Sequence, residues 1–147
     1  MINTYCLLAI LGGALLPLQA GINGNLRTWL GNPWCTTLVS FAVSSCAVLL
    51  MSIITKAQVP NSAVLAQIPW WAWTGGIMGG IYVCSALVSA PKLGAMALVS
   101  SLIAGQMIAS MLLDQFGVAG YSQHSLNAGR TVGAILLCAG VFLIQKY

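Results

Sequence analysis

Five apolar runs divide the chain, and each is long enough to form one helix across a lipid bilayer. A helix needs about 20 mainly apolar residues to span the hydrocarbon core. Runs of this length cover residues 5–25, 34–55, 70–90, 93–113 and 126–145. The pattern predicts an all-α integral membrane protein, with five transmembrane helices in a single domain over residues 1–147.

The breaks between the runs are short or polar. In the first break, Asn32 is expected to cap a helix, with Pro33 at the first helical position, where its missing N–H costs nothing. The longest break is TKAQVPNSAVLAQIP at residues 55–69. The break APKLG is so short that it predicts a tight turn at Pro91–Lys92 between two full spans. The polar stretch at residues 114–129 precedes the last run.

The composition supports a membrane protein. The chain is 59% hydrophobic and only 4% charged, whereas soluble domains carry about 25% charged residues. So few charges could not cover a surface that faces water. No Lys or Arg precedes the first apolar run, although a signal peptide needs such a charge, so we expect a retained first helix.

Several function classes are disfavoured by the same counts. The five Lys and Arg residues are scattered singly, whereas nucleic-acid binding needs them clustered. The five cysteines have no CxxC spacing and there is one histidine, so we expect no disulfide framework, metal site or cofactor. One Asp and one His supply no set of nucleophile, base and orienting group. We therefore expect no enzyme.

The positive charges are balanced across the expected membrane. With five spans, Lys56 and Arg130 fall on one side, and Arg27, Lys92 and Lys146 fall on the other. The N-terminal amine cancels the difference of one, so the positive-inside rule hardly prefers either orientation. Two interpretations stay open. Either a partner sets the orientation, or the chain inserts both ways and pairs as an antiparallel dimer, an inverted repeat of the kind transporters use.

Two of the expected helices carry polar stripes beside ridges of small residues. In the first helix, Gln19 and Asn23 are four residues apart and share a face. In the fourth, Gln106, Ser110 and Asp114 follow one another at the same spacing. Polar groups at this depth either line a cavity or join helices through hydrogen bonds. Both roles stay open for the three amides.

The polar side of the first helix is expected to face a central, partly wet cavity rather than lipid. The candidate substrate contacts are Gln19, Asn23, Gln106 and Ser110, with Trp71 and Tyr82 as aromatic walls. Amides offer donors and acceptors without charge, which suits a neutral or zwitterionic ligand better than a bare cation. Asp114, expected near the membrane interface, is either a solvated anion or a carboxylate that couples transport to an ion.

A family resemblance covers essentially the whole chain. The segments LQAGINGNLR, GNPWCTTLVSF, PWWAWTGGIMGGIYV, APKLGAMALVSSLIAGQMIASMLLDQFG and RTVGAILLCAGVFLI resemble the YdcZ-like family of the drug/metabolite transporter superfamily. The resemblance implies a small multi-pass transporter of the bacterial inner membrane and gives no substrate. It implies membrane lipid and a small molecule as partners.

The end of the chain also resembles small multidrug resistance proteins, which are antiparallel dimeric exporters of cationic compounds. The likeness lies in the carboxylate that ends the penultimate helix and in AGV at residues 139–141. It implies that the last helix forms the dimer contact, with Gly133, Leu137 and Gly140 as candidates. Those exporters carry a glutamate within their first helix, where this chain has Gln19. A neutral or zwitterionic metabolite, or an anion, is therefore expected in place of a cation.

Three functions remain in competition. The first is a dimeric transporter that works by alternating access, pairing with itself or with a paralogue. The second is a small dual-topology channel, which would need a continuous polar pore. The third is a non-transporting assembly subunit, which would give no reason for three amides within the membrane.

Overall fold

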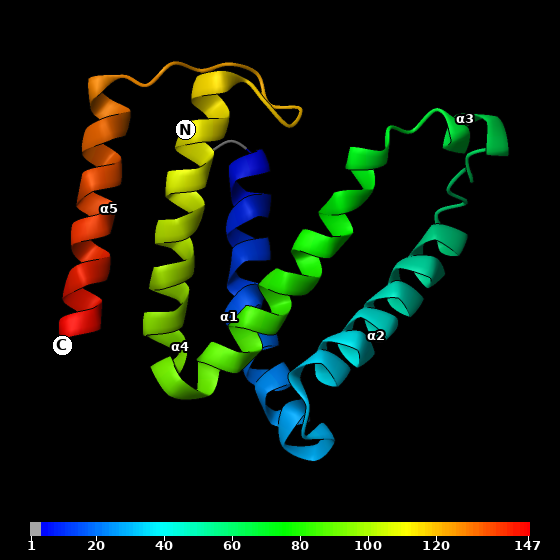
Figure 1. The fold of residues 1–147 in the computed structure, drawn as a ribbon, viewed down its shortest axis with the longest axis horizontal. Helices are drawn as coiled ribbons and strands as arrows, with labels where there is room; N and C mark the ends of the chain where they lie inside the picture. Colours follow the sequence, from blue (N-terminus) through cyan, green and yellow to red (C-terminus); the bar gives the residue numbers. More distant parts are fainter. Residues whose placement is uncertain (1–3) are drawn as a thin grey trace. The chain divides into compact units, whose positions relative to one another are not determined.

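The computed structural model describes residues 4–147, and all regular secondary structure in that range is helical (Figure 1). The elements are α1 (Thr4–Leu30), α2 (Pro33–Ile54), α3 (Ser62–Ala66), the 3-10 helix η1 (Trp70–Trp73), α4 (Thr74–Phe116) and α5 (Ala128–Lys146). By length and composition, four helical runs within residues 4–147 are able to cross a membrane: α1, α2, Trp70–Phe116 and α5. The predicted all-α membrane class is confirmed.

The chain divides into two compact units, with the boundary between Lys92 and Leu93. The first unit, up to Lys92, holds α1, α2, α3, η1 and the first part of α4. The second unit, from Leu93, holds the rest of α4 together with α5. The expectation of a single domain over residues 1–147 stays a prediction.

The helix break in α4 lies at Gly94, two residues after the expected turn at Pro91–Lys92. Pro91 and Lys92 remain helical, so the predicted tight turn at Pro91–Lys92 and the helix limits drawn around it are wrong. Gly94 has φ 75° and ψ 167°, a backbone region that is essentially restricted to glycine. Proline cannot make this turn because its ring holds φ near −65°.

Asparagine caps fix where three helices begin. The Asn32 side-chain oxygen accepts the N–H of Trp34 at 2.8 Å, with Pro33 at the first helical position, as predicted. Asn61 accepts from the third residue after it at 3.0 Å. Asn127 accepts the N–H of Arg130 at 2.9 Å. A capping side chain satisfies an N–H that the helix itself leaves without a partner.

The polar stretch that ends the first apolar run stays helical throughout. α1 continues to Leu30, five residues beyond the expected end of the span. Gly31 then adopts φ 70°, and its N–H donates to the carbonyl of Arg27 at 2.8 Å. This is the usual way in which a glycine closes a helix.

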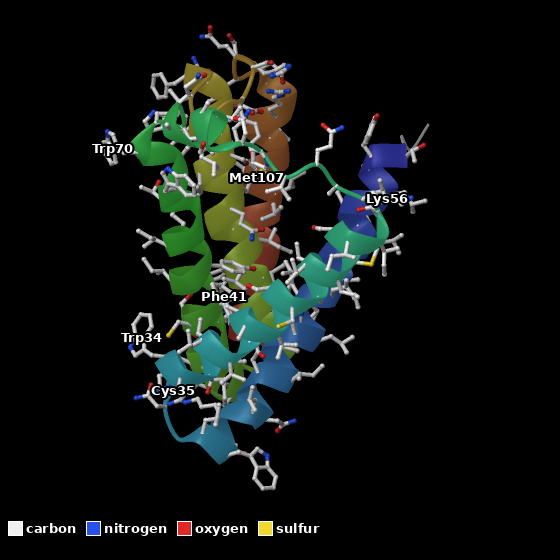
Figure 2. The ribbon with its side chains drawn as sticks, turned by 90° about the vertical axis from the view of Figure 1, so that its right-hand side faces the viewer. Trp34, Cys35, Phe41, Lys56, Trp70 and Met107 are labelled. Carbon is white, nitrogen blue, oxygen red and sulfur yellow. The ribbon has the colours of Figure 1, made fainter. Side chains whose placement is uncertain are left out.

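In the first unit, α1 packs on α2, and α2 also contacts the start of α4 through an aromatic ring. Phe41 of α2 (labelled in Figure 2) lies against Gly79 and Gly80: a Cβ atom on either glycine would stand 3.8 Å from the ring. The absence of side chains at these two positions gives the ring a flat surface. The packing role predicted for the glycines of α4 is confirmed for Gly79 and Gly80, whereas a Cβ atom on Gly75 or Gly76 would meet nothing within 4 Å.

Large apolar side chains face outward along every long helix. Examples are Leu18 of α1, Ile53 of α2 and Leu136 of α5, which are 61%, 66% and 67% exposed. In water, an exposed apolar surface of this extent would favour aggregation or binding to other molecules. In lipid it has no such cost, because the hydrocarbon is as apolar as the side chains.

Candidate functional site

The buried face of α1 is its polar face. Asn23 is 5% exposed and Gln19 is half-buried. The apolar Leu15 and Ile22 on the same helix are more than 60% exposed. This arrangement reverses that of a soluble protein. In lipid an apolar group costs nothing, whereas an amide without a partner costs about 2–7 kcal/mol. The side of α1 that turns away from its exposed apolar residues is therefore the one where amides are expected.

The predicted substrate contacts fall into both units. Trp71 in η1 is exposed and Tyr82 in α4 is half-buried, and both belong to the first unit with Gln19 and Asn23. Gln106 belongs to the second unit and is exposed. In the chain between residues 4 and 147, the three amide side chains form no hydrogen bond with protein groups. A single cavity shared by all of them stays a prediction.

A cavity of about 410 Å³ lies within the second unit, between the last turns of α4 and the first turns of α5. Figure 1 shows α5 beside this part of α4. The cavity is lined by two of the predicted site residues, Ser110 and Asp114. It is also lined by Gly133, which the sequence assigned to dimer packing. The lining residues are Met107, Ser110, Met111, Asp114, Leu126, Arg130, Gly133 and Ala134.

The cavity contains an ion pair between its two charged residues. Nη1 of Arg130 lies 3.3 Å from Oδ2 of Asp114, and the side chains are 42% and 35% exposed. The same Nη1 donates to the carbonyl of His124 at 3.2 Å. Asp114 therefore has a protein partner, and it lies in the last turn of α4. Its place near the membrane interface stays a prediction.

The loop between α4 and α5 is bound to the end of α4 by three further hydrogen bonds. The Asp114 carbonyl accepts the N–H of His124 at 2.8 Å. The Gln115 side chain accepts the N–H of Leu126 at 2.9 Å, and its carbonyl accepts from the side chain of Gln123 at 3.0 Å. These bonds hold Leu126 where it forms part of the cavity wall. His124 is exposed in this loop, as predicted.

The other end of the same helix pair has its own connection. The Gln145 amide donates to the hydroxyl of Ser101 at 2.6 Å and to the carbonyl of Ala97 at 3.2 Å. Within the second unit, α4 and α5 are therefore connected at both ends of the helix pair. The Asp114–Arg130 ion pair connects them at one end, and the Gln145 amide connects them at the other.

Two of the four α2 serines, Ser44 and Ser52, are satisfied locally, as predicted. Ser44 donates to the carbonyl of Ser40 and Ser52 to that of Val48, each at 2.9 Å. Such a bond to the carbonyl four residues earlier lets a hydroxyl lie within lipid. Together with Phe41, these serines line a shallow groove along α2. Their hydroxyl donors are occupied.

Sequence reasoning missed Arg130, Met107 and Met111. Arg130 had been counted only as a topology charge, although it is the cation nearest in sequence to the single acidic residue. The two lie at the facing ends of successive helices, which was the available signal. The methionines carried no signal, because they do not differ in sequence from lipid-facing residues.

Within residues 4–147, no three His, Cys, Asp or Glu side chains gather as a metal site would require, and all five cysteines are free thiols. The structure therefore contains a polar helix face in the first unit and a charged cavity in the second.

The membrane-length helices, the outward apolar surface and the inward polar face of α1 define a multi-pass α-helical membrane protein. Over residues 4–143 the chain matches the family described as "Putative inner membrane exporter, YdcZ". The chain belongs to this YdcZ family, as its resemblance to it implied, and it is a multi-pass inner membrane protein of the transporter class.

A relative supports the same assignment. The chain is 27% identical over 115 residues to the Inner membrane protein YdcZ of Escherichia coli (strain K12), and the match covers 76% of each chain. No solved structure matches.

Proposed function

We propose that this protein exports a small neutral or zwitterionic metabolite across a bacterial inner membrane by alternating access and catalyses no reaction. Gln19, Asn23, Gln106 and Ser110 contact the substrate, with Trp71 and Tyr82 as aromatic walls. The observation that carries the proposal is the burial of Asn23, which is 5% exposed on a helix whose apolar residues face outward. An uncharged amide held out of lipid can bind polar compounds without demanding a counter-ion.

We further propose that the chain crosses the membrane five times. The helical run Trp70–Phe116 has 47 residues, which at 1.5 Å per residue is about 70 Å. That is more than twice the bilayer core of about 30 Å. The break at Gly94 divides the run into two parts of about half this length, and each suits one crossing.

The transporter acts as an antiparallel dimer, either with a second copy or with a paralogue. The support is the near-equal number of positive charges expected on the two faces. Gly133, Leu137 and Gly140 on α5 are the proposed contacts between the chains. Gly140 and Leu137 are half-buried and Gly133 is exposed in the single chain, so a partner could cover this face of the helix.

Transport into sealed liposomes tests the proposal. The purified protein is reconstituted, and uptake of radiolabelled zwitterionic amino acids and neutral sugars is measured against concentration. We expect saturable uptake that is accelerated by unlabelled compound on the opposite side. Uptake that rises linearly without saturation would indicate a channel, and no uptake of any compound would favour an assembly subunit.

Variants connect the flux to the proposed site. Asn23→Ala and Gln19→Ala should abolish uptake while the helix content and the oligomeric state remain unchanged. Ser44→Ala is the control because its hydroxyl is bound within its own helix. Normal uptake by both amide variants would place the substrate elsewhere. Misfolding of both would assign the amides to helix association.

A further inference from the structure

The cavity between α4 and α5 contains one charge of each sign, and both have unused hydrogen-bonding capacity. The ion pair joins Nη1 of Arg130 to Oδ2 of Asp114 through one contact of 3.3 Å. A strong guanidinium–carboxylate pair uses two parallel bonds at shorter distance. Within residues 4–147, Nε and Nη2 of Arg130 and Oδ1 of Asp114 take part in no hydrogen bond. Each charged group can therefore bind a second partner of opposite charge.

The dipoles of the two helices reinforce the electrostatic field of the two charged side chains in the cavity. Arg130 lies in the first turn of α5, close to its positive N-terminal end. Asp114 lies in the last turn of α4, close to its negative C-terminal end. A helix dipole attracts ions of opposite charge within its terminal turn. The α5 side of the cavity therefore attracts an anionic group, and the α4 side attracts a cationic one.

The rest of the lining is apolar, apart from one hydroxyl. Met107, Met111, Leu126 and Ala134 surround the space next to the ion pair. The Ser110 hydroxyl donates to the carbonyl of Met107 at 2.9 Å, so its oxygen is still able to accept a hydrogen bond. Methionine side chains are flexible and adapt to ligands of irregular shape. A ligand that fits this lining has an apolar part beside its charges.

We propose that this cavity binds an amphipathic zwitterion, whose carboxylate or phosphate contacts Arg130 and whose ammonium contacts Asp114 and Ser110. Its apolar part lies along Met107 and Met111. The proposal rests on the proposed function and deepens it at Ser110, the one proposed substrate contact that lines this cavity, by naming the class of compound bound there. The volume of about 410 Å³ is within the usual range for sites that bind small molecules.

Charge balance provides the selectivity. The ion pair is neutral as a unit, and a zwitterion laid antiparallel to it keeps the cavity neutral. A ligand with only an ammonium group, or only a carboxylate, would bring an uncompensated charge into a partly dehydrated space. Such a ligand contacts only one group of the pair and leaves the other without a charged partner on the ligand. The cavity should therefore reject both kinds of singly charged compound.

The same chemistry has two possible sources. One is a free amphipathic amino acid. The other is the headgroup of a zwitterionic phospholipid such as phosphatidylethanolamine, with the beginning of its acyl chains on the methionines. Because the cavity lies where α4 ends and α5 begins, either source can reach it from the membrane interface.

Equilibrium binding to the purified protein in a neutral maltoside detergent tests the proposal without any transport. The probes are phenylalanine, 2-phenylethylamine, 3-phenylpropionate and dihexanoyl phosphatidylethanolamine. The first three share a phenyl group and differ in the charges beside it. We expect phenylalanine to bind at least about tenfold more tightly than either singly charged analogue, the effect of losing one charge-assisted contact.

A matched pair of glycine variants locates the binding. Gly133 lines the cavity, and a Cβ atom there would meet nothing within 4 Å, so Gly133→Leu fills the space. Gly105 of α4 has equally open surroundings and lies outside the cavity. Gly133→Leu should weaken binding of phenylalanine at least about tenfold, and Gly105→Leu should leave it unchanged. The oligomeric state of both variants is measured in parallel, because Gly133 is also a proposed dimer contact.

A neutral double variant covers the case in which Gly133→Leu does not fold. Asp114→Asn combined with Arg130→Gln retains the shape of the pair without its charges. It should bind phenylalanine no more tightly than the two analogues.

Each outcome either supports or overturns the proposed zwitterion site. Binding of the phospholipid alone, lost in Gly133→Leu, supports the site and identifies the lipid as its source. Equal binding of all three phenyl compounds, binding that survives both cavity variants, or binding of neither zwitterion would overturn the proposal. Because no flux is measured, failure here leaves the liposome uptake as a separate test of the transport function.

Discussion

The amide of Gln145, next to the end of α5, donates a 2.6 Å hydrogen bond to the hydroxyl of Ser101, which is 44 residues earlier in α4. Ser101 in turn donates to the carbonyl of Ala97 at 2.7 Å. The donor in one helix and the acceptors in the other thus form a small polar network. It fixes the axial position of α5 against α4 within the second unit.

Breaking this connection should cost a modest amount of stability. Double-mutant cycles in a membrane protein give about 0.6 kcal/mol on average for such bonds, with a maximum of about 1.7. We expect Gln145→Leu and Ser101→Ala to lower the free energy of unfolding, with a coupling of this size between them. Unfolding in mixed micelles of neutral and anionic detergent measures it. Strict additivity of the two effects would show that the bond contributes nothing.

Gly94→Ala should destabilise the protein through its backbone alone. A Cβ atom at this position would meet nothing within 4 Å, yet φ is 75°. We expect a loss of about 1–3 kcal/mol in the free energy of unfolding. Gly105→Ala is the control, since Gly105 is helical and equally open, and there alanine should be neutral or stabilising. A similar loss in both variants would argue against strain at Gly94.

Gly117→Ala should be more harmful than Gly120→Ala. Both glycines have positive φ, 61° and 88°, so both substitutions strain the backbone. A Cβ atom at Gly117 would also lie 3.1 Å from Cβ of Gln123, whereas one at Gly120 would meet nothing within 4 Å. The difference between their melting temperatures isolates the effect of crowding. Equal melting temperatures would mean that the loop around Gln123 yields easily.

Loss of the ion pair should hardly change stability at high salt. The side chains of Asp114 and Arg130 are more than a third exposed, and exposed pairs contribute about 0–1 kcal/mol. We expect Asp114→Asn to cost no more than this at low ionic strength and less at 1 M salt, because salt screens such charges. A loss of several kcal/mol that is insensitive to salt would instead indicate a buried structural pair.

Dual topology predicts partial labelling of a loop residue. Ser122→Cys, in a variant without the native cysteines, places one thiol in the exposed loop between α4 and α5. In sealed, uniformly oriented membrane vesicles, an impermeant maleimide should label about half of the molecules. Two lysines added at the C-terminus should shift this fraction towards none or all, because sparse charges decide orientation. Complete labelling, or none, before the lysines are added would contradict dual insertion.

The pattern of apolar positions predicted the helices well because length and hydropathy alone determine what lipid accepts. It predicted the start of α2 for a local reason, the Asn32 cap with Pro33 after it. It missed the break at Gly94 because the proline in the same short segment was the more conspicuous signal. Whether Pro91 or Gly94 forms the turn depends on the backbone angle φ at each residue. The amino-acid sequence alone does not give that angle.

The second-unit cavity could not be predicted as a whole for a different reason. Ser110 and Asp114 were found because their spacing places them on one face of a single helix. Arg130 and Gln145 act across two helices, and their partners depend on how the loop at residues 117–127 folds. Distances of 16 and 44 residues along the chain carry no periodic signal that would link such positions.

The three asparagine caps have a consequence for where this protein can work. Asn32, Asn61 and Asn127 fasten helix starts with amides, where many proteins use aspartate. An aspartate cap loses its charge in acid, and its attraction to the helix end weakens in salt. An asparagine amide has no charge that acid could remove or that salt could screen. The helix starts should thus remain equally well fastened on an acidic or a neutral face of the membrane.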